Sequence, residues 1–316
     1  MEKDYGHRPV LLQECLEGLA IRPDGIYLDG TLGRAGHSLE ILRRLTTGRL
    51  VGLDRDMAAI EAARERLAEF GDRVSLVHTN FSRLSEALDS LGIDKVDGML
   101  FDLGVSSPQL DEGERGFSYM QDAPLDMRMD KDAALTAREV VNTFSEEELR
   151  RILFDYGEER YAPKIARAIC RRRQERPIET TLELVDVIKG AMPPAALREK
   201  QHPAKRSFQA LRIAVNGELD ELPPMLEAAV QRLKPGGRLA LITFQTLEDR
   251  IVKQTMKKLA AGCTCPPEFP VCVCGKKPLM TLVNRKPITS GEEELRENPR
   301  ARSAKLRVAE RTSYEP

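Results

Sequence analysis

The chain has 316 residues, of which 41% are hydrophobic and 31% charged, a globular composition that excludes a disordered chain or a coiled coil. At about 100–200 residues per domain, this length accommodates two packed domains or one domain with a large insertion. The 49 Lys and Arg residues nearly balance 50 Asp and Glu residues, so any nucleic-acid partner must be recognised by local basic charge. Without an apolar run of about 18 residues or a secretory signal pattern, we expect a cytoplasmic protein with no membrane partner.

The N-terminal third alternates short apolar segments with amphipathic ones. Strands are predicted at 26–29, 49–53, 74–78 and 96–102. The segments between these strands are rich in helix-forming residues, and helices are predicted at 37–46, 56–70 and 82–91. This alternation predicts an α/β fold, with a parallel, doubly wound sheet covered by helices on both faces.

The alternation stops after residue 102. A loop-like run at 103–130 is followed by a helical pattern at 134–212 without a clear strand. A helix at 218–233, a Lys-Pro-Gly-Gly turn and an apolar strand at 238–244 then resume the first pattern. We therefore predict a Rossmann-like domain formed by 1–133 and 213–316, with a helical domain inserted at 134–212.

The insertion carries most of the local positive charge. Residues 160–212 contain 13 Lys and Arg against 5 Asp and Glu, a net charge of +8, which leaves −1 − 8 = −9 for the remainder. Two clusters stand out, Arg171-Arg172-Arg173 and Lys205-Arg206, and we interpret them as phosphate contacts. A solvated helix face is the alternative interpretation of such a run.

A glycine-rich loop follows the first predicted strand, in the sequence DGTLGRAGH. Its glycines permit a tight turn and close approach of a ligand, but their spacing matches neither the dinucleotide fingerprint nor the P-loop. Asp54 ends the second strand, where a carboxylate can accept both hydroxyls of a ribose. Asp54 could instead cap the next helix, although Asp56 is better placed for that. S-adenosylmethionine contains a ribose but no pyrophosphate, so a loop without the nucleotide fingerprints, followed by a ribose-binding carboxylate, favours this ligand.

Two further strand ends offer site residues. Phe81 follows the third strand and could contact an adenine, or it could be a core aromatic. Asp102 ends the fourth strand, at the sheet edge where open α/β folds place their chemistry.

Four of the six cysteines lie within the segment CTCPPEFPVCVC, as Cys263, Cys265, Cys272 and Cys274. A reducing compartment disfavours disulfides, which leaves a metal site or a thiol-containing loop. The Cys-x-Cys spacing departs from the Cys-x2–4-Cys knuckles usual for zinc. We therefore expect a proline-stiffened loop without a metal ion.

Several long segments together resemble one family. These are DGTLGRAGHS, DGMLFDLGVSSPQLDEGERGFSYMQDAPLDMRMD, HPAKRSFQALRIAVNGEL, LEDRIVK and NPRARSAKLRVAER, and the resemblance runs from His7 to Arg311. The chain resembles the RsmH (MraW) family of bacterial methyltransferases. The resemblance implies a Rossmann-like class I methyltransferase fold and S-adenosylmethionine as cofactor. It also implies methylation of the N4 amine of a cytidine in the decoding region of 16S rRNA, in the small ribosomal subunit.

The resemblance also implies a set of cofactor-binding residues, namely Ala35, Gly36, His37, Asp54, Phe81, Asp102 and Gln109. The chain departs from the family at two places. Ala35 stands where glycine is usual, and this requires an ordinary φ at that residue. Gln245 and Thr246 replace the family's His-Ser, so we expect the replaced histidine to have a hydrogen-bonding role rather than that of an obligatory base.

For the chemistry we predict that Asp102, with Ser106 or Ser107, accepts hydrogen bonds from the target amine. Phe117 and Tyr119 are predicted to stack on a flipped base. The serines could instead form a turn, and the aromatic residues a local core. The predicted substrate-binding set is Phe117, Tyr119, Arg171, Arg172, Arg173, Lys205 and Arg206.

Two other functions remain open at this point: methylation of another nucleic-acid or protein amine, and a noncatalytic rRNA-binding assembly factor of the same fold. The presence of both Asp54 and Asp102 argues against the noncatalytic alternative.

Overall fold

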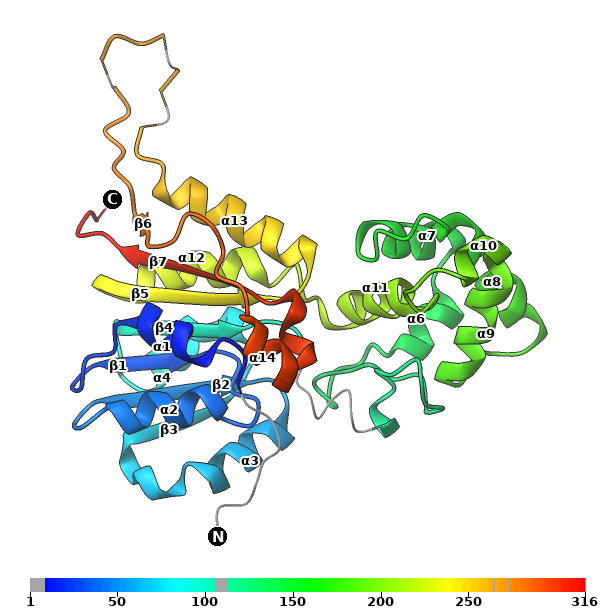
Figure 1. Cartoon of the computed structure of the whole chain (residues 1–316), viewed down its shortest axis with the longest axis horizontal. Helices are drawn as coiled ribbons and strands as arrows, with labels where there is room; N and C mark the ends of the chain where they lie inside the picture. The colour runs from blue at the N-terminus through cyan, green and yellow to red at the C-terminus, as the bar shows by residue number, and fades with distance from the viewer. Residues whose placement is uncertain (1–8, 106–112, 264, 267, 272, 316) are drawn as a thin grey trace. The chain divides into compact units, whose positions relative to one another are not determined.

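The computed structural model describes residues 9–105, 113–263, 265–266, 268–271 and 273–315 (Figure 1). The chain divides into two compact units. The first comprises Met1–Gly104 and Leu219–Pro316, and the second Val105–Glu218. Within the described residues, no helix is both long enough and apolar enough to cross a bilayer.

The first unit is built on a seven-stranded sheet in the order β3-β2-β1-β4-β5-β7-β6. Strands β1 to β5 pair in parallel, whereas β7 runs antiparallel to both β5 and β6. The strands are β1 (Ile26–Asp29), β2 (Arg49–Asp54), β3 (Val74–His78), β4 (Val96–Asp102), β5 (Leu233–Thr243), β6 (Met280–Leu282) and β7 (Lys305–Arg311). The expected Rossmann-like, doubly wound sheet is confirmed.

Helices cover both faces of this sheet. Helices α1 (Leu12–Leu19), α2 (Gly36–Arg44) and α3 (Met57–Arg66) share one apolar core with residues of the central strands. On the other face, α12 (Leu222–Arg232) contacts α4 (Leu84–Ser90) and α13 (Thr246–Ala260). Short helical segments complete the unit: η1 (Ala68–Arg73), η2 (Phe81–Arg83), α14 (Glu292–Glu297) and η4 (Pro299–Ser303). The parallel strands therefore have buried faces, which explains their continuous apolar sequences.

The last strands were absent from the sequence-based prediction. β7 lies between β5 and β6 in the sheet. Its sequence, KLRVAER, contains three basic residues and therefore lacks the apolar pattern expected of a buried strand. Arg307 is buried because its guanidinium pairs with Asp249, and Arg311 because it donates to the carbonyl groups of Val230 and Leu279. The expected turn at 234–237 instead lies inside β5, where the pairing with β4 shifts register.

The second unit is helical, with α6 (Ala137–Thr143), α7 (Glu146–Asp155), α8 (Ala162–Glu175), α9 (Thr181–Ala191), α10 (Pro194–Leu197), α11 (Lys205–Asn216) and the short segment η3 (Gly113–Arg115). Capping boxes begin α6, α7 and α9, each formed by a Ser or Thr with a Glu three residues later. This unit extends beyond the predicted insertion at 134–212. The reason is that Leu125, Met127 and Met129 belong to its apolar core, where Asn216 bonds the backbone of Met127 and Met129.

Candidate active site

Three aspartates end neighbouring parallel strands at the carboxyl edge of the sheet. Asp29 is the last residue of β1, Asp54 of β2 and Asp102 of β4. Because β1 pairs with both β2 and β4 in parallel, the three carboxyl groups project from one edge. This edge is where open α/β sheets bind their ligands.

Asp54 is fixed by the loop that follows β1. Its Oδ2 accepts a hydrogen bond from the Gly33 amide at 2.8 Å, and its Oδ1 accepts one from the Asp56 amide at 2.9 Å. Burial raises the pKa of Asp54 to about 6, although these two bonds oppose the shift. Asp56, rather than Asp54, caps α3 by accepting from the Ala58 amide. A carboxylate has about four acceptor positions, so Asp54 retains capacity for ligand hydroxyls.

Asp29 is a site residue that the sequence analysis missed. Its side chain is 2% exposed, its Oδ2 accepts from Ser38 Oγ at 2.7 Å, and its Oδ1 accepts from the Thr31 amide at 3.2 Å. Burial raises the pKa of Asp29 to about 6. The signal was present, because the apolar strand IYLD ends in an aspartate just as β2 and β4 do.

Asp102 carries an unsatisfied acceptor. Its Oδ1 is buried and has no hydrogen-bond partner among the described residues. Burial raises the pKa of Asp102 to about 6, and the nearby His37 opposes this shift. Nδ1 of His37 lies 3.9 Å from Asp102 Oδ2, while its Nε2 donates to the Val10 carbonyl at 2.9 Å. A buried acceptor without a donor is costly, which indicates a place for a ligand.

Two residues of the glycine-rich loop, Gly33 and Ala35, have left-handed backbone conformations. Gly33 has φ +50°, and its amide faces Asp54. Ala35 has φ +57° and ψ +31°, so our expectation of an ordinary φ at this alanine is wrong. N-cap residues usually have extended φ/ψ, as Asp56 does before α3, so the left-handed conformation of Ala35 belongs to the turn that its amide closes on the Leu32 carbonyl at 2.7 Å. A side chain in this region is strained, which accounts for the glycine usual in the family.

Gly36 and Phe81 line the same edge. Gly36 opens α2, and a Cβ on it would lie 2.5 Å from Cγ of Pro9. Phe81 is 9% exposed and packs edge-on against Phe101, with ring centroids 6.1 Å apart. The Arg55 guanidinium lies 5.8 Å from the Phe81 ring centroid. Phe81 is thus largely a core residue whose remaining surface is at the end of β3.

Three predicted site residues, Ser106, Ser107 and Gln109, lie outside the described residues. The loop that contains Gln245 is described. Gln245 precedes α13, and the carboxylate of Glu248 accepts hydrogen bonds from the amides of Phe244 and Gln245. Glu248 is buried and contributes to the raised pKa of Asp102, so it is a second acidic residue that sequence reasoning did not single out.

The second unit contains the predicted stacking residues. Phe117 is 5% exposed and belongs to the helical core, so its ring offers no free face. Tyr119 is half-buried and stacks on His202, with ring centroids 4.6 Å apart and an interplanar angle of 16°. Phe208 contacts the same tyrosine edge-on. Tyr119 and His202 therefore form an aromatic pair at the surface of this unit.

The basic residues of the second unit differ in their partners. Arg172 and Arg173 donate to the carbonyl groups of Arg176 and Val141, and Arg206 donates to that of Glu158. Arg171 and Lys205, in contrast, are exposed, and their side chains make no ion pair or hydrogen bond with any residue that the structure describes. Arg171 and Lys205 are therefore the members of the predicted set best able to contact a phosphate.

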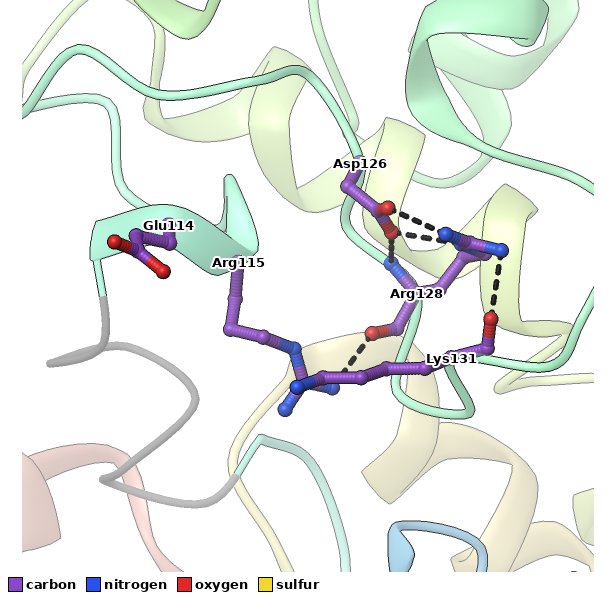
Figure 2. A pocket seen from close by; sticks show the side chains of 5 residues that line it. All are labelled: Glu114, Arg115, Asp126, Arg128 and Lys131. Atoms are coloured by element: carbon purple, nitrogen blue, oxygen red, sulfur yellow. Dashed lines mark hydrogen bonds and ion pairs between the residues drawn. The ribbon is translucent and has the colours of Figure 1, made fainter. Parts of the chain in front are cut away.

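A pocket of about 430 Å³ also lies in the second unit (Figure 2). Arg115 is buried there and donates to the carbonyl groups of Arg128 and Met129, while Arg128 pairs with Asp126. Lys131 extends toward the Arg115 guanidinium (Figure 2). None of the predicted cofactor residues that the structure describes lines this pocket.

Comparison with known proteins gives consistent results. The model of the MraW methylase family matches residues 4–312. "Ribosomal RNA small subunit methyltransferase H" of Symbiobacterium thermophilum is 58% identical, covering 96% of each chain. The proteins of that name from Heliobacterium modesticaldum and Geobacter sp. are each 56% identical, covering 97% and 98% of this chain and 99% of their own length.

Solved structures are more distant. An rRNA methylase from Streptococcus thermophilus aligns with a TM-score of 0.41 and 10% identity, covering 96% of this chain and 94% of its own. The N-methyltransferase NodS from Bradyrhizobium japonicum aligns with a TM-score of 0.43 and 8% identity, with the same two coverages. Similarity at this level decides nothing about the activity of this chain.

Proposed function

Because the chain belongs to the MraW methylase family, we propose that it methylates the exocyclic N4 amine of a cytidine in the decoding region of bacterial 16S rRNA. The observation that carries the proposal is the identity of 54–58% over nearly the whole chain with small-subunit rRNA methyltransferases. In this proposal the protein acts in the cytoplasm on rRNA of the small ribosomal subunit. S-adenosylmethionine is the cofactor.

The residues at the carboxyl edge of the sheet fit this cofactor. S-adenosylmethionine has ribose hydroxyls, an ammonium group and a cationic sulfonium centre. Asp29, Asp54 and Asp102 supply acidic groups at this edge, and Asp102 Oδ1 is a buried acceptor for which the described residues provide no donor. Cationic and hydroxyl donors would offset the cost of burying these carboxylates. When bound, the cofactor supplies an electrophilic methyl group on its sulfonium sulfur.

Each predicted cofactor residue then has a proposed role. Asp54 accepts hydrogen bonds from the ribose hydroxyls, for which its remaining lone pairs are suited. Phe81 presents its small exposed surface to the adenine. Ala35 and Gly36 present the start of α2, and His37 stays beside Asp102 through its bond to the Val10 carbonyl. Gln109 completes the proposed set from outside the described residues.

Asp102 is the proposed catalytic residue. The amine of cytosine is a poor nucleophile because its lone pair is delocalised into the ring. Asp102 accepts an N–H hydrogen bond, which holds the nitrogen in position and favours its conversion to a tetrahedral geometry. With a pKa of about 6, Asp102 is mostly ionised at neutral pH and can also take the proton that leaves nitrogen. Ser106 and Ser107 are the proposed additional acceptors.

The second unit is proposed to bind the rRNA. Exposed Arg171 and Lys205 would contact phosphates, and Arg172, Arg173 and Arg206 would support them. Tyr119 would stack on a base, with His202 behind it as the second ring. Phe117 would act indirectly, by anchoring the segment that carries Tyr119 in the helical core.

The proposal is tested by offering labelled S-adenosylmethionine together with four separate acceptors: small ribosomal subunits lacking the modification, naked 16S rRNA, duplex DNA and total protein. We expect label in the subunits or the naked rRNA. Label confined to DNA or protein would identify a methyltransferase for another amine. The absence of transfer to any acceptor, with rRNA binding retained, would identify a noncatalytic assembly factor.

A further inference from the structure

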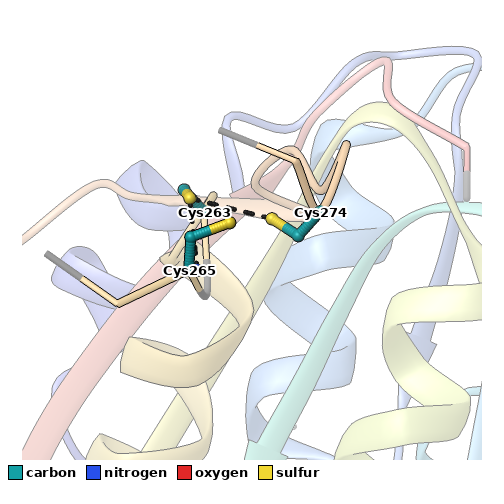
Figure 3. A group of neighbouring side chains, drawn as sticks. All are labelled: Cys263, Cys265 and Cys274. Atoms are coloured by element: carbon teal, nitrogen blue, oxygen red, sulfur yellow. Dashed lines mark hydrogen bonds between the residues drawn. The ribbon is translucent and has the colours of Figure 1, made fainter. Parts of the chain in front are cut away.

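The cysteines after α13 lie close together in the structure. The Sγ atoms of Cys263, Cys265 and Cys274 are all within 4.8 Å of one another. Figure 3 shows the three side chains directed toward a common point. We propose that these three thiolates bind a structural zinc ion.

The sulfur separation matches a shared metal ion. The Sγ atoms of Cys263 and Cys274 are 3.7 Å apart. Two sulfurs bound to one tetrahedral zinc at about 2.3 Å lie about 3.8 Å from each other. A disulfide requires about 2.05 Å, so these two sulfurs are not covalently bonded, and their separation fits two ligands of one ion as well as a thiol hydrogen bond.

The backbone supports the charge that metal binding requires. The amide of Cys265 donates a hydrogen bond to Cys263 Sγ at 3.3 Å. An amide donor stabilises a thiolate, and zinc binds the thiolate form of cysteine. The same bond places Cys263 and Cys265 on one side of the loop, although a single residue separates them. The spacing that disfavoured zinc in the sequence is therefore compatible with convergence in space.

Among the residues of the loop that the structure describes, from Cys263 to Cys274, no side chain is buried. Phe269, Val271 and Val273 are 51%, 69% and 74% exposed. A turn closed by the Phe269 amide and the Pro266 carbonyl brings the cysteines of its two arms back together. A metal ion that links the arms supplies the stabilisation that side-chain burial does not.

The topology assigns this ion a structural role. α13 begins just after the carboxyl end of β5 and leads back along the sheet, so Cys263 lies near the opposite, amino end of the parallel strands. The segment between α13 and β6 projects from that end of the sheet (Figure 1). The aspartates of the candidate active site all lie at the other edge.

The test is metal analysis of full-length protein purified without chelator or added reductant. We expect about one zinc ion per chain, and its loss in Cys263→Ser and Cys274→Ser. The matched control is Cys170→Ser, a partly buried cysteine of α8 outside the cluster, which should keep the metal. Substitution by Co²⁺ should give the thiolate-to-metal charge-transfer absorption of a tetrahedral sulfur site, and lose intensity in each cluster variant.

Three outcomes would overturn the proposal. The first is less than about one tenth of a zinc ion per chain together with an octahedral Co²⁺ spectrum. The second is a disulfide between Cys263 and Cys274 in the native protein, detected by mass spectrometry without reduction. The third concerns the role of the ion: loss of methyl transfer on chelation, restored by zinc, would make it a participant in the reaction rather than a structural ion.

Discussion

Replacing Asp102 by Asn should separate stability from activity. Asn keeps the size of the side chain but cannot ionise. In the wild type, burial raises the pKa of Asp102 from 3.8 to about 6. The folded state therefore loses stability as the pH rises between these two values, because the unfolded chain ionises more readily. Asp102→Asn avoids that loss. Its unfolding free energy should therefore exceed that of the wild type by the full amount above pH 6 and by nothing near pH 4.

The magnitude follows from the shift. A change of about two pKa units corresponds to about 3 kcal/mol. Because 27% of the Asp102 side chain is exposed, solvent screens part of this cost, and we expect a gain of about 1–2 kcal/mol in unfolding free energy at pH 8. Methyl transfer by the same variant should fall at least about a hundredfold, since Asn keeps an acceptor oxygen but has no negative charge and cannot take the proton that leaves nitrogen.

The assay is urea unfolding of the cofactor-free protein at pH 8 and pH 4.5, together with labelled methyl transfer at pH 8. Asp97→Asn is the control, because Asp97 is also buried but pairs with Arg22 and Lys234 and accepts from the Ile26 amide. This control should lose about 2 kcal/mol. Equal destabilisation of Asp102→Asn at both pH values, or full activity in that variant, would refute the reasoning.

Three further substitutions probe other parts of the account. Ala35→Gly should raise the unfolding free energy by about 0.5–1 kcal/mol by relieving the left-handed strain. The control, Ala62→Gly within α3, should lower it by about 1 kcal/mol. A loss of stability in both variants would contradict the strain argument. Asp54→Ala should weaken S-adenosylmethionine binding about 10–100-fold by calorimetry, and an unchanged affinity would remove Asp54 from the ribose site. Arg171→Ala should reduce by about 1 the slope of the logarithm of the RNA-binding constant against the logarithm of salt concentration. Arg173→Ala should leave this slope nearly unchanged, because the Arg173 guanidinium donates to a backbone carbonyl. Equal slopes for the two variants would identify this run as a solvated helix face.

The parallel part of the sheet could be predicted from sequence because buried parallel strands are continuous apolar runs with helices between them. β1, β3 and β4 lie where the pattern placed them. The pattern failed for β7, since a charged sequence is buried only when partners elsewhere in the chain neutralise it. Those partners become visible only in the folded structure.

The residues of the candidate site that could be predicted are those at the carboxyl ends of parallel strands. Asp54 and Asp102 follow from the rule that parallel strands present ligands at their carboxyl ends. The conformation of Ala35 was not predictable, because the residue type favours an ordinary φ, whereas the turn closed by the Ala35 amide and the Leu32 carbonyl places the residue in the left-handed region. Phe117 shows the same limitation, since sequence alone does not distinguish a core aromatic from one that stacks on a base.

The position of the transferred methyl group tests the central claim most directly. Small subunits lacking the modification are incubated with the protein and S-adenosylmethionine, and the rRNA is then digested to nucleosides and, separately, to mapped fragments. The account predicts N4-methylcytidine, confined to a decoding-region fragment of 16S rRNA. A methyl group on a ring carbon or a ribose hydroxyl, or at a site outside that region, would contradict it.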